Sequence, residues 1–235
     1  LLGAVELQRA DGPWTVPERL HKDNAVFTLA GGTAAQGFSA SLMAYRARWT
    51  ATDQVPQRLI DAGHYEGQPF GRFDSLDPST GGDTSRSSLS AEWHAGSAAG
   101  RTRVSAYAIR YRLDLNSNFT YALERPADGD QFKQRDSRTV LGLSGSRTVS
   151  HSLGGLDARS EFGLSLRHDR IRVGLFDSVA RAITATVRDD EVRETMLGAY
   201  AQTAVDLPGR LRAIVGLRAD QVRNRVDALS LPANG

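Results

Sequence analysis

The side chains best suited to binding a metal are acidic residues grouped around a diglycine. Asp74, Asp77 and Asp83 lie before and after Gly81-Gly82, and clustered carboxylate oxygens are the ligands that Ca²⁺ takes in proteins. Their spacing lacks the alternating oxygens and the terminal Glu of an EF-hand loop. Two interpretations follow: a calcium loop or, the favoured one, a turn in which Asp side chains accept hydrogen bonds from nearby backbone.

Carboxylates and hydroxyls elsewhere do not form a catalytic set. Glu161 and Asp169 are eight residues apart in an extended segment, so at about 3.3 Å per residue they are roughly 26 Å apart. That distance is too long for two carboxylates that act on one bond. The sequence has no Gly-x-Ser-x-Gly motif followed by Asp and His in a strand-turn-helix context. We therefore predict that the chain is not an enzyme.

The five histidines, His21, His64, His94, His151 and His168, show no spacing that would bring two onto one metal. His64 lies in a long polar segment, where a single imidazole could hold a metal-bearing ligand. The chain has no cysteine, which removes disulfides and thiolate metal sites. We expect neither a cofactor nor a resident metal.

Charge and hydropathy narrow the class further. The 29 basic and 27 acidic residues are interspersed and give a net charge of +2, so no basic stripe of the kind that binds nucleic acid is present. Mean hydropathy is −0.37, and no segment approaches the roughly twenty apolar residues of a membrane helix. Nucleic acid is not an expected partner, and a spanning helix is not an expected element.

Strands are the elements that must position these side chains, because apolar and polar residues alternate along segments of about ten residues. In 161–169, Phe162, Leu164 and Leu166 share one face, while Glu161 and Arg167 lie on the other. We predict about nine such strands. They cover 3–8, 24–30, 38–50, 86–95, a segment around 107–113, 138–148, 161–169, 192–207 and 211–225.

Short and long connections alternate between these strands. The short turns are expected at 31–36, 96–100 and 208–209, and the long polar loops at 53–85 and 116–135, with a milder one near 179–191. This pattern predicts an antiparallel transmembrane β-barrel with an apolar face toward lipid, a polar face toward a wet lumen, and long loops outside the cell. The alternative is a soluble all-β module, a sandwich or propeller that recognises carbohydrate or protein and hides the apolar face in a core.

Several segments together resemble the barrel portion of TonB-dependent outer-membrane receptors, and the resemblance covers most of the chain. The segments are Trp49 with Asp53-Gln54, Pro56 and Arg58; 71–86; Gly129-Asp130-Gln131-Phe132 with Gln134, Asp136 and Arg138; and 199–202 with 211–220.

The resemblance implies a barrel of about 22 strands that an N-terminal plug fills. It also implies energy-coupled uptake of a scarce ligand, such as a siderophore, vitamin or saccharide, across the outer membrane of a Gram-negative bacterium. Residues 1–235 are then part of the barrel domain alone. The plug, the segment that contacts the TonB complex and the aromatic-ended last strand are expected outside this stretch, and outer-membrane lipid is expected around it.

The candidate sites follow from this arrangement. Asp53 and Arg58 are expected either to contact ligand or to pin their loop to the barrel wall. Aromatic residues Trp49, Trp93, Tyr107, Tyr111 and Phe119 are expected in girdles at the membrane interface. The candidate ligand-binding residues are Asp53, Gln54, Arg58, His64, Asp77, Asp130 and Gln131. The candidate lumen residues, expected to face the plug, are Arg110, Arg112, Glu161, Arg167, Arg218 and Asp220.

Overall fold

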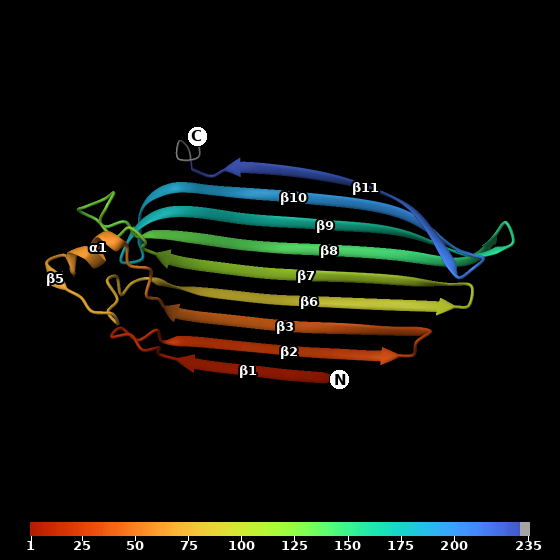
Figure 1. Cartoon of the computed structure of the whole chain (residues 1–235), viewed down its shortest axis with the longest axis horizontal. Coiled ribbons are helices and arrows are strands. Elements are labelled where there is room, and N and C mark those ends of the chain that lie inside the picture. The colour runs from red at the N-terminus through yellow and green to blue at the C-terminus, as the bar shows by residue number, and fades with distance from the viewer. Residues whose placement is uncertain (231–235) are drawn as a thin grey trace.

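The computed structural model describes residues 1–230, and within them the chain forms one antiparallel sheet of nine strands (Figure 1). The strands follow one another across the sheet in chain order, from β1 at one edge to β11 at the other. Their bounds are β1 Leu2–Ala10, β2 Leu20–Gly32, β3 Gln36–Thr50, β6 Gly81–Ser97, β7 Gly100–Ser117, β8 Phe132–Leu153, β9 Leu156–Val179, β10 Ala182–Leu207 and β11 Leu211–Ala228.

The predicted strands are confirmed, and each observed strand contains its predicted segment. The observed strands are longer, because backbone hydrogen bonding continues beyond the segments in which apolar and polar residues alternate and includes polar residues next to them. Within residues 1–230 no second layer packs on this sheet, which argues against a sandwich. In the same residues, no helix is long and apolar enough to cross a membrane.

The prediction of a shorter polar loop near 179–191 is wrong. β9 ends at Val179 and β10 begins at Ala182, so only Ala180 and Arg181 form the connection. Both have positive φ, 47° and 72°, as in the two-residue turns that match strand twist. The polar residues after them belong to β10 and pair with β9 through two register irregularities.

The two ends of the sheet differ (Figure 1). One end has only short turns, at 33–35, 98–99, 154–155 and 208–210. The other end has the long connections 51–80 and 118–131, together with 11–19. The first long loop contains the helix α1 Gln57–Ala62 and a small hairpin of β4 His64–Tyr65 with β5 Gln68–Pro69. The two major loops predicted from the sequence are therefore confirmed, and both lie at this end.

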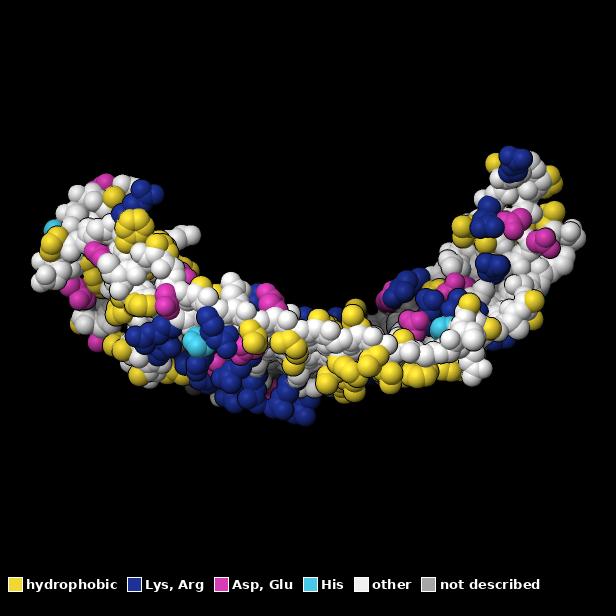
Figure 2. All heavy atoms as spheres, turned by 90° about the horizontal axis from the view of Figure 1, so that it is seen from below, with side chains coloured by type: hydrophobic (Ala, Val, Ile, Leu, Met, Phe, Trp, Pro, Cys, Tyr) yellow, Lys and Arg dark blue, Asp and Glu magenta, His cyan; other side chains and the backbone are white. Residues whose placement is uncertain are grey.

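Cross-strand pairing fixes which side chains share a face, because directly opposed residues point the same way. One row of directly opposed residues crosses four neighbouring strands and consists of Leu42, Leu89, Ala108 and Leu141. We call the side of the sheet to which these side chains point the outer face. The leucines among them are 50–54% exposed, as expected for a surface that meets lipid. Figure 2 shows hydrophobic side chains and a patch of Lys and Arg on the convex side of the bent sheet.

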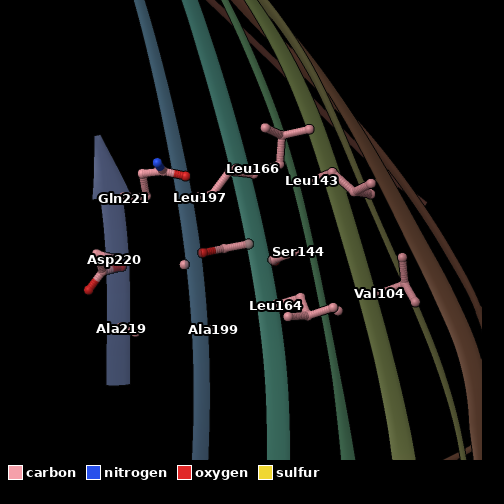
Figure 3. Close-up of a pocket in the computed structure, with 13 residues that line it drawn as sticks. Val104, Leu143, Ser144, Leu164, Leu166, Leu197, Ala199, Ala219, Asp220 and Gln221 are labelled. Atoms are coloured by element: carbon pink, nitrogen blue, oxygen red, sulfur yellow. The ribbon is translucent and has the colours of Figure 1, made fainter. Parts of the chain in front are cut away.

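Four leucines on the outer face line an apolar hollow, seen in close-up in Figure 3. They come from three adjacent strands, β8, β9 and β10. Leu166 is opposite both Leu143 and Leu197, and Leu164 is the neighbouring outward residue on β9. We call this surface the leucine hollow, and its members are Leu143, Leu164, Leu166 and Leu197.

The register corrects two expectations about faces. Arg110 and Arg112 follow Ala108 at two-residue steps, so they lie on the outer face and not with the predicted lumen residues. Tyr107 and Tyr111 lie on the opposite, inner face, so the expectation of a lipid-side girdle fails for them. Alternation within one strand shows that two faces differ, but only pairing with neighbouring strands shows which face is which.

Candidate ligand-binding rim and inner face

The first long loop is closed at its base by a local backbone and side-chain exchange. The N–H of Ala51 donates to the Thr80 carbonyl at 3.1 Å, and Thr80 Oγ1 donates to the Ala51 carbonyl at 2.7 Å. α1 then ends at Gly63, whose φ of 71° is the left-handed conformation that glycine adopts without steric cost. The loop therefore leaves and re-enters the sheet at adjacent points.

A cluster of polar side chains joins the two long loops, and we call it the loop clamp. Asn118 is its centre: its backbone N–H donates to Asp53 Oδ2 at 2.7 Å, and its Nδ2 donates to Asp77 Oδ2 at 3.0 Å. Gln131 Nε2 donates to the same Asp77 oxygen at 2.9 Å. The members of the loop clamp are Asp53, Asp77, Asn118, Asp130 and Gln131.

Asp130 organises the second loop from inside. The residue is 7% exposed, and its carboxylate accepts hydrogen bonds from the backbone N–H groups of Leu123, Glu124 and Arg125, two of them at 2.7 Å. Three N–H donors converging on one carboxylate form an anion nest that Asp130 itself fills. Asp130 thus shapes 121–130 and is not open to a ligand.

Gln131 extends the clamp to the tight β9–β10 turn. Its Oε1 accepts a hydrogen bond from Ser178 Oγ at 3.0 Å and another from the Arg181 N–H at 2.8 Å. Arg181 Nε in turn donates to the Ser79 carbonyl at 2.6 Å. Three connections that are far apart in the sequence are therefore joined through one buried amide.

Burial opposes the charged form of each clamp carboxylate. At Asp77, hydrogen bonds from the surrounding side chains outweigh burial and hold its pKa below the usual value. At Asp130, the backbone donors do the same and also lower the pKa. At Asp53, burial prevails over the hydrogen bond from Asn118, and the pKa is raised. Two of the three carboxylates are thus stabilised as anions.

The seven candidate ligand residues separate into two groups. Asp53, Asp77, Asp130 and Gln131 lie in the loop clamp, and the remaining three are exposed at the rim, on and beside α1. These are Gln54, Arg58 and His64.

Arg58 also donates to the Thr120 carbonyl of the other long loop. Asn118 and Arg181 were not found by sequence reasoning, because the other loop residues that they join are at least 41 residues away.

The acidic residues around the diglycine have separate partners. Asp74 accepts from the Gly71 N–H at 2.7 Å and from Thr15 Oγ1 at 2.9 Å, and Asp83 pairs with Arg46 at 3.3 Å. Because the carboxylates do not converge, the contacts match the turn interpretation. In residues 1–230 no group of three potential metal ligands is found.

The inner face carries the other four predicted lumen residues as closed pairs. Arg167 binds both oxygens of Asp169, at 2.8 and 2.7 Å, and Arg218 binds both oxygens of Asp220, at 2.7 and 2.6 Å. Glu161 accepts from the Tyr200 hydroxyl at 2.5 Å. Arginine and carboxylate two residues apart on one strand face each other, which keeps the inner face charged but locally neutral.

Solved structures share this fold. The FecA ferric citrate transporter in its unliganded form matches with a TM-score of 0.74 and 10% identity, over 97% of this chain and 33% of that one. The Fiu ferric-catecholate import receptor from E. coli K12, in its closed form, matches at 0.69 and 11%, over 96% of this chain and 37% of that one. P. aeruginosa FpvA bound to heterologous pyoverdines matches at 0.62 and 11%, over 97% and 33%.

The chain therefore spans about a third of the length of these structures. No curated protein matches it. The family model described as "TonB dependent receptor-like, beta-barrel" matches residues 18–233, which is most of the sequence and includes every strand except β1. The resemblance predicted from separate motifs is thereby confirmed, and the chain belongs to the TonB-dependent receptor β-barrel family.

Proposed function

We propose that this chain is part of an outer-membrane receptor of a Gram-negative bacterium that takes up a scarce ligand through a plugged barrel. The observation that carries the proposal is the asymmetry of the sheet: short turns at one end, and at the other two long loops held together by the loop clamp. Ordering a long loop costs conformational entropy, so such loops persist where something is recognised.

Within this proposal, the loop clamp is the support and the exposed rim is the recognition surface. Gln54, Arg58 and His64 offer an amide, a guanidinium and an imidazole to solvent, and these groups suit an anionic or metal-bearing ligand. Family neighbours are named for ferric citrate, ferric catecholate and pyoverdine. A siderophore is accordingly the first ligand class to test, followed by a vitamin and a saccharide.

The partners follow from the same proposal. A plug domain of the same parent chain contacts the inner face, where Arg167 and Arg218 are ion-paired with Asp169 and Asp220, and where Glu161 carries a negative charge. The TonB complex acts through an N-terminal region of the parent, and lipid covers the outer face. The alternative of a soluble carbohydrate- or protein-binding module requires a second layer over the exposed leucines, and no such layer packs on the sheet in residues 1–230.

The test uses the intact parent protein, with residues 57–69 replaced by a short Gly-Ser linker that leaves Asp53 and Asp77 in place. The probes are ferric citrate, a ferric catecholate, a ferric pyoverdine, cobalamin and a maltooligosaccharide. We expect one probe to be taken up in a TonB-dependent manner. The excision should weaken its binding by about tenfold or more while the barrel keeps its resistance to SDS.

The control inserts the same linker after Gly155, in a short turn at the opposite end of the sheet. Uptake should be unchanged in that variant. Uptake that persists without TonB would contradict the energy-coupled function. Binding that is indifferent to the loop excision would remove the rim from recognition.

A further inference from the structure

Two arginines on the outer face lie between the leucine hollow and the long loops. Arg110 and Arg112 are both exposed and occupy successive outward positions on β7. Directly opposite Arg110 are Ser87 and Thr139, and directly opposite Arg112 are Ser85 and Ser137. We call these six residues the arginine site.

The two arginines differ from several neighbouring cations of the outer face, which are ion-paired. Arg46 pairs with Asp83 at 3.3 Å, and Arg172 pairs with Asp189 at 2.8 Å. Asp114, the next outward residue after Arg112, is engaged by Lys133 at 3.5 Å and by Arg135 at 3.3 Å. Among residues 1–230, no carboxylate forms an ion pair with Arg110 or Arg112, so their positive charge is left for an external anion.

The composition of the arginine site suits a phosphate group. Opposed residues of an antiparallel pair have Cβ atoms about 4.5–5.5 Å apart, so the four hydroxyl-bearing residues lie on both sides of the two arginines in the sheet. Guanidinium groups bind phosphate oxygens through paired N–H donors, and hydroxyls add further donors. Threonine and serine contribute no charge, which leaves the site cationic.

The leucine hollow is an apolar surface near this cationic site. Thr139 is two residues from Leu141, and Arg170, opposite Thr139, is four residues from Leu166 of the leucine hollow. At about 3.3 Å per residue, the arginine level and the hollow are roughly 13 Å apart along the strand. A molecule with a phosphate head and acyl chains would satisfy both surfaces at once, whereas a free anion or an acidic peptide would use only the first.

We infer that the arginine site binds the phosphate of a lipid headgroup, with the acyl chains of that lipid lying on the leucine hollow. An arginine on a lipid-facing surface costs much free energy at the bilayer midplane and little at the interfaces. Exposed arginines on such a surface are therefore expected at the level of the lipid headgroups. The inference rests on the proposed membrane function, and the proposed orientation puts this lipid in the outer leaflet.

The test measures lipid retention by native mass spectrometry of the intact parent protein in neutral detergent, with diphosphoryl lipid A as the probe. The unaltered protein is compared first with dephosphorylated lipid A of the same acyl composition. We expect a preference of about tenfold or more for the phosphorylated form, as two charge-assisted contacts would give. Equal affinity for the two forms would overturn the inference without any variant.

The double variant Arg110→Gln/Arg112→Gln should reduce binding of diphosphoryl lipid A by about tenfold. Its matched control is Arg86→Gln, because Arg86 lies between Ser85 and Ser87 at the same height but points to the inner face. The control should bind as the unaltered protein does, and an equal loss in both would overturn the inference. Displacement of the lipid by excess inorganic phosphate would also overturn it, since that marks a free-anion site. Uptake of the ligand and cleavage of the loops do not enter these readouts, so failure here is distinguishable from failure of the proposed function.

Discussion

Two tyrosines of the inner face lie over glycines on the neighbouring strand. Tyr107 is opposite Gly142, and Tyr200 is opposite Gly163. A Cβ at Gly163 would be 2.0 Å from the Tyr200 ring, so the glycine is needed for close approach and not for its φ. With its ring over Gly163, Tyr200 donates a hydrogen bond from its hydroxyl to Glu161.

Gly163→Ala should therefore destabilise the barrel by about 1–3 kcal/mol, because the ring must leave its rotamer and lose the hydrogen bond to Glu161. Gly145→Ala is the control, since the nearest atom to a Cβ there is 3.8 Å away. We expect its stability to be unchanged or slightly raised. Apparent melting temperature in detergent measures both, and equal effects of the two substitutions would contradict the role of the tyrosine.

The clamp carboxylates make the loops sensitive to acid. The pKa of Asp77 and of Asp130 is lowered in the folded state from 3.8, so their stabilisation is present above the unfolded value and is lost as pH falls through the lower folded values. Asp53, with a raised pKa, acts in the opposite sense and offsets part of this. Below about pH 4, hydrogen exchange of 118–131, corrected for intrinsic rate, should therefore accelerate.

Asp77→Asn tests the same contacts at neutral pH. An amide in place of the carboxylate weakens acceptance from Asn118 and Gln131, so a glutamyl endopeptidase should cleave after the exposed Glu124 several-fold faster than in the unaltered protein. Asp128→Asn, in the exposed part of the same loop, should have no effect. Cleavage at equal rates in both variants would show that the clamp does not hold the loop.

Strand identity was readable from the sequence wherever apolar and polar residues alternate, as in β10 and β11. The turn at 180–181 was not, because neither residue is a glycine, asparagine or aspartate and the polar residues after it resemble a loop. The loop clamp was only half predicted: Asp53, Asp77, Asp130 and Gln131 stood out, but Asn118 and Arg181 are recognisable only once the register brings them close. The outward direction of Arg110 likewise depends on cross-strand pairing, which is a property of the assembled sheet.

The unusual turn between β9 and β10 gives a direct test of backbone strain. Ala180 has a φ of 47°, a conformation that disfavours most L-residues, β-branched ones above all, but that asparagine tolerates. Ala180→Asn should raise the free energy of unfolding by about 0.5–1 kcal/mol, and Ala180→Val should lower it. The apparent melting temperature measures both changes. The side chain of Ala180 is exposed, so packing does not complicate the comparison. If valine were tolerated as well as asparagine, the turn would have a different conformation.

One added charge should destabilise the protein on the outer face of the sheet and be tolerated on the inner face. Leu143, Leu164 and Val215 lie on the outer face. Ser144 follows Leu143 on β8 and therefore points to the inner face. Arginine at any of the three should cost about 2–4 kcal/mol near the bilayer midplane, whereas Ser144→Arg meets a wet lumen. Folded, SDS-resistant protein recovered from membranes measures the difference, and equal yields would remove lipid from the outer face.

The orientation of the molecule decides which end recognises ligand. Residues 1–235 have no cysteine, so in a parent protein freed of any cysteine elsewhere, a single introduced cysteine reports on one site. Ala127→Cys lies in the exposed part of 118–131 and Gly209→Cys lies in the β10–β11 turn at the opposite end. A membrane-impermeant maleimide added to intact cells should label the first and leave the second unlabelled until the outer membrane is opened. Cleavage after the exposed Glu124 by a glutamyl endopeptidase should follow the same rule. Labelling only at Gly209 would invert the receptor and place the arginine site in the inner leaflet, while equal labelling of both would show that this segment does not span the membrane in the intact protein.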